Sequence, residues 1–232
     1  MKNNIDLVEH CKKALSEGWG YVYGTFGNIL THDLLRYKYI QYPANIHPYI
    51  DFIEQNYIGK RVTDCVGLIK SYMWWDGSNP VYDSTTDKSA NGMFEASVVK
   101  GTIDTIPEIS GILVWRKGHI GVYIGNGKVI ESKGTKYGVV QTPLKGLNSN
   151  KWTHWCMCPY IEYITEMMDM VFKDLIVNGN RHWAADIIEK AAEEGIVKGI
   201  KQPDGSYVFK PDSPITRAET IVLIMRALGK AE

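Results

Sequence analysis

The sequence predicts an α+β domain followed by a small all-α module, and three observations lead to this prediction. Apolar residues recur at helical spacing directly after Cys65. Short apolar stretches separated by turn residues predict an antiparallel sheet, at 112–115, 119–124, 128–132, 138–142 and 152–160. Two further apolar stripes at helical spacing follow a change in composition. We therefore expect a domain over 1–163 whose Cys65 helix packs on the sheet, a linker over 164–169, and a helix-loop-helix domain over 170–232.

The residues before Cys65 predict three helices. Apolar positions between Ile5 and Leu15 give an amphipathic first helix that ends near Gly18. Two further helical patterns lie within 30–37 and 50–57, separated by X-Pro pairs that interrupt the chain. Beyond the Cys65 helix, the polar, turn-rich stretch 76–100 predicts a mobile loop over one side of the site.

Composition excludes several classes of function. The 232 residues carry a formal net charge of +0, so no bulk charge indicates nucleic acid as a partner. No stretch has the roughly 20 apolar residues needed to span a bilayer, and residues 1–10 lack the apolar core of a secretory signal. His154, Cys156 and Cys158 alternate along the last predicted strand, but a Cys-x-Cys pair on a straight strand rarely converges on one ion. We therefore expect buried packing there, and neither a metal nor an organic cofactor.

Cys65 is the first candidate for a functional residue. We expect it in the first turn of its helix, with Asp64 or Thr63 as the cap. Free backbone N–H groups and the helix dipole at that position favour a thiolate. A thiolate nucleophile still needs a base, and His119 opens a predicted strand further along the chain. A cysteine on a helix and a histidine on a strand indicate a thiol hydrolase.

The motifs around these residues resemble the NlpC/P60 family of cysteine peptidases, which cut bacterial cell-wall peptides. The matching stretches are Tyr21-Val22-Tyr23-Gly24-Thr25, Asp64-Cys65-x-Gly67-Leu68-Ile69 and the run His-Ile-Gly-Val-Tyr-Ile-Gly-Asn-Gly over 119–127. The resemblance implies a papain-like fold with Cys65 as nucleophile and His119 as general base. It also implies that Glu131, twelve positions after the histidine, orients the imidazole, and that Tyr21, Tyr23 and Asp64 bind substrate.

The sequence departs from the family pattern in two places. Val66 stands where the family usually has a serine that helps to hold a free N-terminal amine of the stem peptide. The chain also has a long segment between Tyr23 and Asp64, which we expect to build one wall of the groove.

Two registers of the hairpin that carries His119 are open from sequence. A two-residue turn at Asn126-Gly127 places Ser132 on the face of His119, whereas a three-residue turn places Glu131 there. The family spacing favours Glu131, and a carboxylate stabilises an imidazolium better than a hydroxyl does.

The end of the chain resembles one S-layer homology motif over 170–229. The matching stretches occur in order: Phe172-Lys173-Asp174, His182-Trp183-Ala184, Phe209-Lys210-Pro211-Asp212 and Ile215-Thr216-Arg217-Ala218-Glu219. Thr216 and Glu219 form a predicted capping box, which holds Arg217 at a helix N-terminus suited to anions. The resemblance implies binding of an anionic secondary cell-wall polymer, which we assign to Arg217, with Trp183 and Asp174 as further candidates. The alternative is that Arg217 only pairs with a neighbouring acid.

These expectations together predict a peptidoglycan hydrolase of the phage endolysin type. It would cut an amide bond of the stem peptide, as an endopeptidase or as an N-acetylmuramoyl-L-alanine amidase, and bind the wall through the S-layer homology motif. Such motifs usually act in threes, so a single copy predicts a homotrimer. Without a signal peptide, the protein would stay in the cytoplasm until holin-type lysis delivers it to the cell wall. The alternative is a non-catalytic, wall-anchored binding protein with an inactive hydrolase domain.

Overall fold

The computed structural model describes residues 2–164, 172–177, 180–204 and 206–230. The chain divides into two compact units, Met1–Tyr163 and Ile164–Glu232, each with its own apolar core. Of the linker expected at 164–169, all but Ile164 lies outside the described residues. Within the described ranges, no helix combines the length and the hydropathy needed to cross a membrane.

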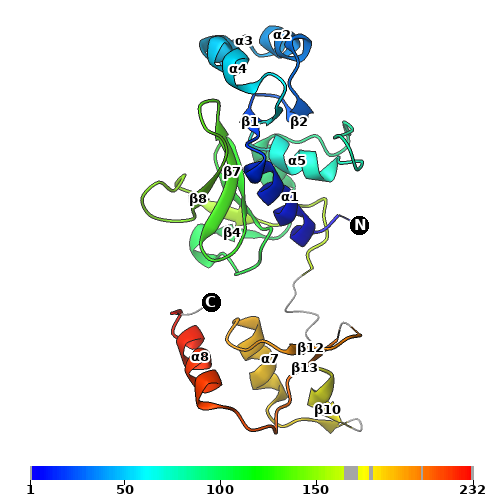
Figure 1. Cartoon of the computed structure of the whole chain (residues 1–232), viewed down its shortest axis with the longest axis vertical. Helices are drawn as coiled ribbons and strands as arrows, with labels where there is room; N and C mark the ends of the chain where they lie inside the picture. The colour runs from blue at the N-terminus through cyan, green and yellow to red at the C-terminus, as the bar shows by residue number, and fades with distance from the viewer. Residues whose placement is uncertain (1, 165–171, 178–179, 205, 231–232) are drawn as a thin grey trace. The chain divides into compact units, whose positions relative to one another are not determined.

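The first unit is organised by a six-stranded antiparallel sheet, of which β4, β7 and β8 are labelled in Figure 1. Its strand order is β4-β9-β5-β6-β7-β8. The strands are β4 (Lys100–Thr102), β5 (Leu113–Arg116), β6 (His119–Tyr123), β7 (Lys128–Gly134), β8 (Gly138–Pro143) and β9 (His154–Cys156). Five of them overlap the predicted stretches, and β5, β7 and β8 end one or two residues beyond the predicted ends. Strand β4 begins at the end of the expected loop and was not predicted. Its three residues have little burial, and so short a strand shows no clear alternation in the sequence.

Helices α1 (Asn4–Ser16) and α5 (Gly67–Met73) cover one face of this sheet. Leu7, Val8 and Cys11 of α1 are buried against Ile120 and Ile130 of the sheet. The α+β arrangement predicted from the sequence is therefore confirmed, with the helix that follows Cys65 packed on the sheet.

A second, three-stranded sheet precedes α5, with the strand order β1-β3-β2. It consists of β1 (Gly20–Tyr21), β2 (Phe26–Ile29) and β3 (Arg61–Thr63). Strand β1 runs parallel to β3, whereas β2 runs antiparallel to it. This sheet leads the chain into Cys65 and was not predicted, because strands of two to four residues show no periodicity.

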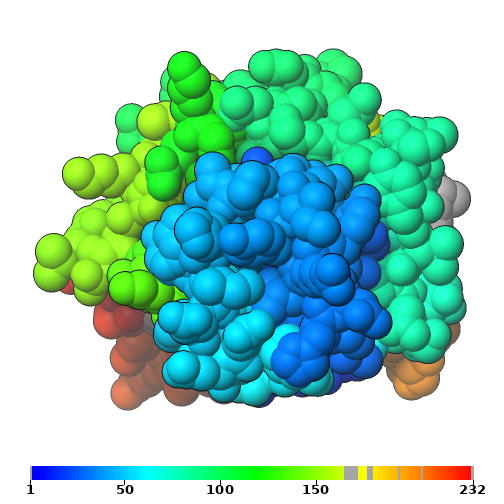
Figure 2. All heavy atoms as spheres, turned by 90° about the horizontal axis from the view of Figure 1, so that it is seen from above, coloured from blue at the N-terminus to red at the C-terminus, as the bar shows by residue number. Residues whose placement is uncertain are grey.

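The segment inserted between β2 and β3 is helical and has its own core. It contains α2 (His32–Gln41), α3 (Pro43–Ile46), a 3₁₀ turn (His47–Tyr49) and α4 (Ile50–Tyr57). The core of this segment is made of seven buried residues: Val22, Leu30, Leu35, Ile46, Ile53, Tyr57 and Val62. Figure 2 looks onto these helices, with the stretch that follows α5 beside them on the same face.

The stretch 76–100, expected as a loop, contains the helix α6 (Ala90–Ala96), which Ser89 caps by accepting the Gly92 N–H. The approach to this helix is held in place by polar contacts. Arg61 donates to the Ser78 carbonyl at 2.9 Å, and Lys70 forms an ion pair with Asp87. These contacts fix the stretch as a wall beside α5.

In the second unit, two helices follow each other as predicted. They are α7 (Ala185–Glu193) and α8 (Arg217–Ala227). A 3₁₀ turn (Lys173–Leu175) and two short antiparallel strand pairs lie in the connections: β10 (Ile176–Val177) with β11 (Asn180–Arg181), and β12 (Ile200–Lys201) with β13 (Tyr207–Val208). Phe172, Leu175 and Ile188 are among the buried residues of this core. Helix α8 has no buried residue.

Candidate active site

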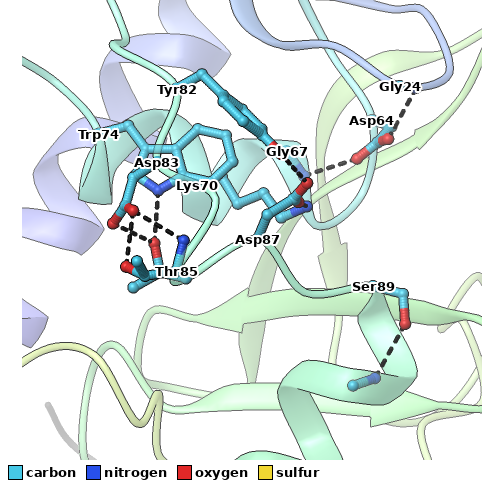
Figure 3. Close-up of polar contacts among 12 residues, drawn as sticks. Gly24, Asp64, Gly67, Lys70, Trp74, Tyr82, Asp83, Thr85, Asp87 and Ser89 are labelled. Atoms are coloured by element: carbon cyan, nitrogen blue, oxygen red, sulfur yellow. Dashed lines mark hydrogen bonds and ion pairs between the residues drawn. The ribbon is translucent and has the colours of Figure 1, made fainter.

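Cys65 lies in the turn that joins β3 to α5, two residues before the helix begins at Gly67. Its predicted place inside the first helical turn is therefore wrong by two residues. The predicted cap is also displaced, because the N-cap position is Val66, which makes no side-chain cap hydrogen bond. The Asp64 carboxylate nevertheless accepts the N–H of Gly67, the first helical residue, at 2.7 Å. The other oxygen of Asp64 accepts the Gly24 N–H at 2.9 Å (Figure 3). Asp64 thus joins the Cys65 turn to the loop after Tyr23.

Gly67 is required by the close approach of two backbone segments at this turn. A Cβ atom added at Gly67 would lie 2.0 Å from the Thr25 carbonyl oxygen, a distance that no side chain tolerates. The turn that presents Cys65 is therefore packed directly against the loop 24–26.

Burial and the neighbouring Asp64 carboxylate raise the pKa of Cys65 to about 12. The backbone N–H groups of Ile120, Val66 and Cys65 itself act in the opposite direction but do not outweigh burial. Burial therefore opposes the thiolate that the start of the helix was expected to favour. A raised pKa favours the thiol, so a base must take its proton before the sulfur can attack.

His119, the first residue of β6, is joined to the carboxylate of Glu131 on β7. Its Nε2 lies 2.7 Å from Glu131 Oε2, and the Glu131 side chain is completely buried. Two other side chains donate to the same carboxylate: Thr142 Oγ1 to Oε1 at 2.6 Å, and Asn150 Nδ2 to Oε2. Burial alone would raise the pKa of Glu131, but these hydrogen bonds hold it below its usual value. A charged carboxylate therefore supports the imidazole.

The register of the hairpin explains why Glu131, rather than Ser132, meets His119. Val122 pairs with Ile130, and the Ile124 N–H donates to the Lys128 carbonyl at 2.9 Å, which leaves a three-residue turn at 125–127. This is the second of the two registers considered from sequence. Ser132 points elsewhere and donates to the Thr63 carbonyl at 3.0 Å.

Trp152 fixes the plane of the imidazole. The ring centroids of His119 and Trp152 are 5.4 Å apart with an interplanar angle of 13°, so the two rings are stacked. Because Nε2 is engaged by Glu131, Nδ1 is the ring nitrogen left to exchange a proton. The structure also brings Cys65 next to this strand, since the N–H of Ile120, the residue after His119, donates to the Cys65 sulfur.

A groove of about 780 Å³ opens at Cys65. Its lining includes the loop 23–26, the Cys65 turn and α5, part of α2, and the stretch between Tyr82 and Asn91. Gly118, the residue before His119, also lines it. The inserted segment therefore contributes a wall of the groove, as expected.

Of the three residues expected to bind substrate, Tyr23 and Asp64 line this groove. Tyr23 packs edge-to-face on Tyr42 of the inserted segment, with 5.0 Å between ring centroids. Tyr21 is not among the lining residues. It lies on β1 opposite Thr63. Burial is the main cause that raises the pKa of its hydroxyl, and the nearby Cys65 raises this pKa further.

Sequence reasoning missed the residues that support the His119–Glu131 pair. Thr142 lies on β8, and Val129, its partner across the strands, is two residues from Glu131. A correct β7–β8 register would therefore have suggested it. Asn150 lies in a connection between strands, and no sequence signal marks it.

The three wall-binding candidates of the second unit occupy different settings. Arg217 is the first residue of α8, and the predicted capping box is confirmed, with Glu219 accepting the Thr216 N–H at 2.8 Å. Trp183 is 86% exposed. The carboxylate of Asp174 accepts the N–H groups of residues 209 and 210, so it serves the fold of the unit. Within the described ranges, no hydrogen bond or ion pair joins the three candidates, and no carboxylate oxygen lies within 4 Å of an Arg217 nitrogen.

The metal site considered for the last strand does not form among the residues that the structure describes, where no cluster of His, Cys, Asp or Glu can hold an ion. Cys156 and Cys158 are buried, and Cys158 contacts Met73 of α5.

Residues 179–221 match the family model of the S-layer homology domain. No curated protein sequence matches the chain. Among solved structures, the chain is similar to the P60 domain of an antigen from M. avium subspecies paratuberculosis, with 16% identity and a TM-score of 0.36 over 69% of this chain and 98% of that one. NlpC1 from Trichomonas vaginalis has 16% identity and a TM-score of 0.38 over 67% of this chain and 44% of that one. The peptidoglycan hydrolase RipB from Mycobacterium tuberculosis has 14% identity and a TM-score of 0.36 over 69% and 67%. The predicted resemblance to an S-layer homology motif is thereby confirmed, and the solved structures similar to the chain include a P60 domain and an NlpC protein.

Proposed function

We propose that the protein is a peptidoglycan hydrolase that cuts an amide bond through Cys65, with His119 as general acid and base and Glu131 as a positioning residue. The observation that carries this proposal is the buried His119–Glu131 pair beside the Cys65 turn, at the edge of a groove. A buried, charged carboxylate is costly to maintain, and such pairs are concentrated at functional sites. The cell-wall substrate is supported by the motifs around Cys65 and His119 and by the S-layer homology match.

The mechanism follows from the protonation states. Nδ1 of His119 takes the proton of the Cys65 thiol as the sulfur attacks the amide carbonyl carbon, and Glu131 stabilises the imidazolium that forms. The N–H of Cys65 and its neighbours in the turn stabilise the oxyanion. The imidazolium then gives its proton to the leaving amine. Water, activated by the neutral imidazole, hydrolyses the thioester and restores the thiol.

Two cleavage sites fit this mechanism, an amide within the stem peptide and the amide between muramic acid and L-alanine. The first often requires recognition of a free amine. Here Val66 replaces the serine of the family pattern, and both oxygens of Asp64 already accept backbone N–H groups. These two observations support the amidase. The alternative is an inactive, wall-anchored protein. In such a protein, the ordered His119–Glu131 pair would have no function.

We further propose that the second unit binds an anionic wall polymer through Arg217 and Trp183, and that it self-associates. Ile221 and Ile224 of α8 and its C-cap residue Leu228 are each more than half exposed, and this apolar face supports contact with other copies of the chain. A homotrimer fits the usual use of such motifs in threes. Light scattering of the full chain at micromolar concentration tests this, and a strict monomer would refute it. The endolysin role, with release by holin-type lysis, belongs to the same proposal.

Digestion of purified Gram-positive cell walls tests the enzyme. Wild type and Cys65→Ala are incubated with walls, and the soluble products are read by mass spectrometry. We expect released stem peptides or new amino termini with wild type alone, and the product masses identify the bond. If wild type sediments with the walls but releases nothing, the inactive wall-binding protein becomes the better description.

A further inference from the structure

Lys38 is a buried lysine in the wall of the groove. It lies on α2 and is 8% exposed, whereas the adjacent Tyr37 is 57% exposed. Its ammonium group donates to the Gln41 side-chain oxygen at 2.9 Å and lies 5.2 and 5.5 Å from the ring centroids of Tyr37 and Tyr42. A neutral acceptor and two ring faces compensate a buried cation poorly, and burial lowers the pKa of Lys38.

The other charged groups of the groove already have partners. Lys70 is paired with Asp87, whose second oxygen accepts the Tyr82 hydroxyl at 3.0 Å (Figure 3). Both oxygens of Asp64 accept backbone N–H groups. Across the part of the chain that the structure describes, no carboxylate oxygen comes within 4 Å of the Lys38 ammonium group. Asp64 and Asp87 attract the Lys38 ammonium group from beyond ion-pair distance and do not outweigh burial. Among these residues, Lys38 therefore makes no direct ion pair in the groove.

We propose that Lys38 and Gln41 form a carboxylate-binding subsite, so that the groove selects stem peptides with a free carboxylate. The Gln41 oxygen accepts from Lys38, which leaves the NH₂ group of the same amide as a second donor. The rings of Tyr37 and Tyr42 shield the ammonium group from water, and a charge-assisted hydrogen bond is stronger in such a setting. Substrate identity here rests on the proposed hydrolase function. The carboxylate has two sources in a stem peptide, the α-carboxyl of the glutamyl residue and the C-terminal carboxyl.

Calorimetric titration of the full-length Cys65→Ala protein tests the subsite without turnover. The probes are a synthetic L-Ala-γ-D-Glu-L-Lys-D-Ala tetrapeptide and two monoamides, one at the glutamyl α-carboxyl and one at the C-terminus. We expect one monoamide to bind about tenfold more weakly or worse, because a charged hydrogen-bond partner is lost. The identity of that monoamide names the source of the carboxylate.

Variants on the same helix assign the preference to Lys38. In the Cys65→Ala background, Lys38→Met should bind the acid and both amides alike, while Lys38→Arg should keep most of the preference. Arg36→Met is the matched control, because Arg36 is exposed on α2 and lies outside the groove lining. Thermal unfolding verifies that each variant is folded, and the acid–amide comparison in the Cys65→Ala protein stands even without a folded Lys38 variant.

Equal affinity for the acid and both amides, a preference that survives Lys38→Met, or no binding at millimolar peptide would overturn the subsite. The outcome of the wall digestion described above tests the hydrolase proposal separately from the subsite proposal. An acid preference that depends on Lys38, combined with no product from wild type, would refute the hydrolase and leave the subsite standing. Hydrolysis of amidated and free-acid walls at equal rates, with equal peptide affinities, would refute the subsite alone.

Discussion

Replacing Glu131 with glutamine isolates the charge of the buried carboxylate from its shape. Three donors converge on Glu131: His119 Nε2 and Asn150 Nδ2 on Oε2, and Thr142 Oγ1 on Oε1. A glutamine oxygen in the Oε2 position still accepts from His119 and Asn150. Its NH₂ group then faces Thr142, whose hydroxyl rotates to accept. Glu131→Gln therefore keeps the hydrogen-bonding geometry and removes only the negative charge.

The expected consequence falls on catalysis. A hydrogen bond to a charged group contributes about 1.5–3 kcal/mol against about 0.5–1.5 kcal/mol for a neutral one. The imidazolium of both transition states therefore loses about 1–2 kcal/mol of stabilisation. This loss corresponds to a fall in kcat of about 5- to 30-fold. The assay is the initial rate of stem-peptide release from walls at saturating substrate, together with a thermal unfolding curve.

Ser132→Ala is the matched control for this experiment. Ser132 is the neighbouring buried residue, but its hydroxyl contacts the Thr63 carbonyl and not His119. We expect this variant to lose about 1 kcal/mol of stability while its kcat stays within about twofold of wild type. If Glu131→Gln retained the wild-type kcat, or if Ser132→Ala caused the larger fall in kcat, the assignment of Glu131 as the positioning residue would be refuted.

Three further predictions concern the Cys65 turn and the buried carboxylate. Gly67→Ala should lower the free energy of unfolding by about 2 kcal/mol or more, because its Cβ meets the Thr25 carbonyl; an unchanged urea midpoint would contradict this close approach. Alkylation of Cys65 by iodoacetamide, followed by mass spectrometry, should be slow at neutral pH and still accelerate above about pH 9, because the thiol pKa is about 12; a rate that is flat from pH 6 upward would show a preformed thiolate. The pKa of Glu131 is lowered in the folded protein, so its contribution to stability is present above the unfolded pKa of about 4.3 and is lost as pH falls through the folded value. The urea midpoint of wild type should therefore fall more steeply than that of Glu131→Gln below about pH 4, and parallel curves would argue against a charged Glu131.

The parts of the fold that were predictable are those with a clear hydrophobic period. Helix α1 buries Leu7, Val8, Cys11 and Ala14 at helical spacing. The strands β6 and β7 are short, mostly buried apolar stretches next to turn residues, so their positions also followed from the sequence. The sheet formed by β1, β2 and β3 was missed, since its strands are too short for any period to appear.

The candidate site was predictable to the same extent. His119 and Glu131 were identified by motif and spacing, but their contact depends on a turn in which Gly125, Asn126 and Gly127 all have positive φ angles. Glycine and asparagine permit that conformation without requiring it, so both registers were open from sequence. Lys38 gave no sequence signal, because a lysine on a polar helix is usually solvated and only the tertiary fold buries it.

The helical segment of the groove wall enters and leaves the domain through adjacent strands. Asn28 pairs with Val62 and Ile29 pairs with Arg61, so its two ends are neighbours in the β2–β3 ladder. The segment also has its own core, separate from the one that supports α5. Closing a short loop across such a pair carries a small entropic cost. This helical segment is therefore suited to replacement by protein engineering. Another sequence between Ile29 and Arg61 would change which peptides the groove accepts, while the strands and helix that position the nucleophile and its base stay the same.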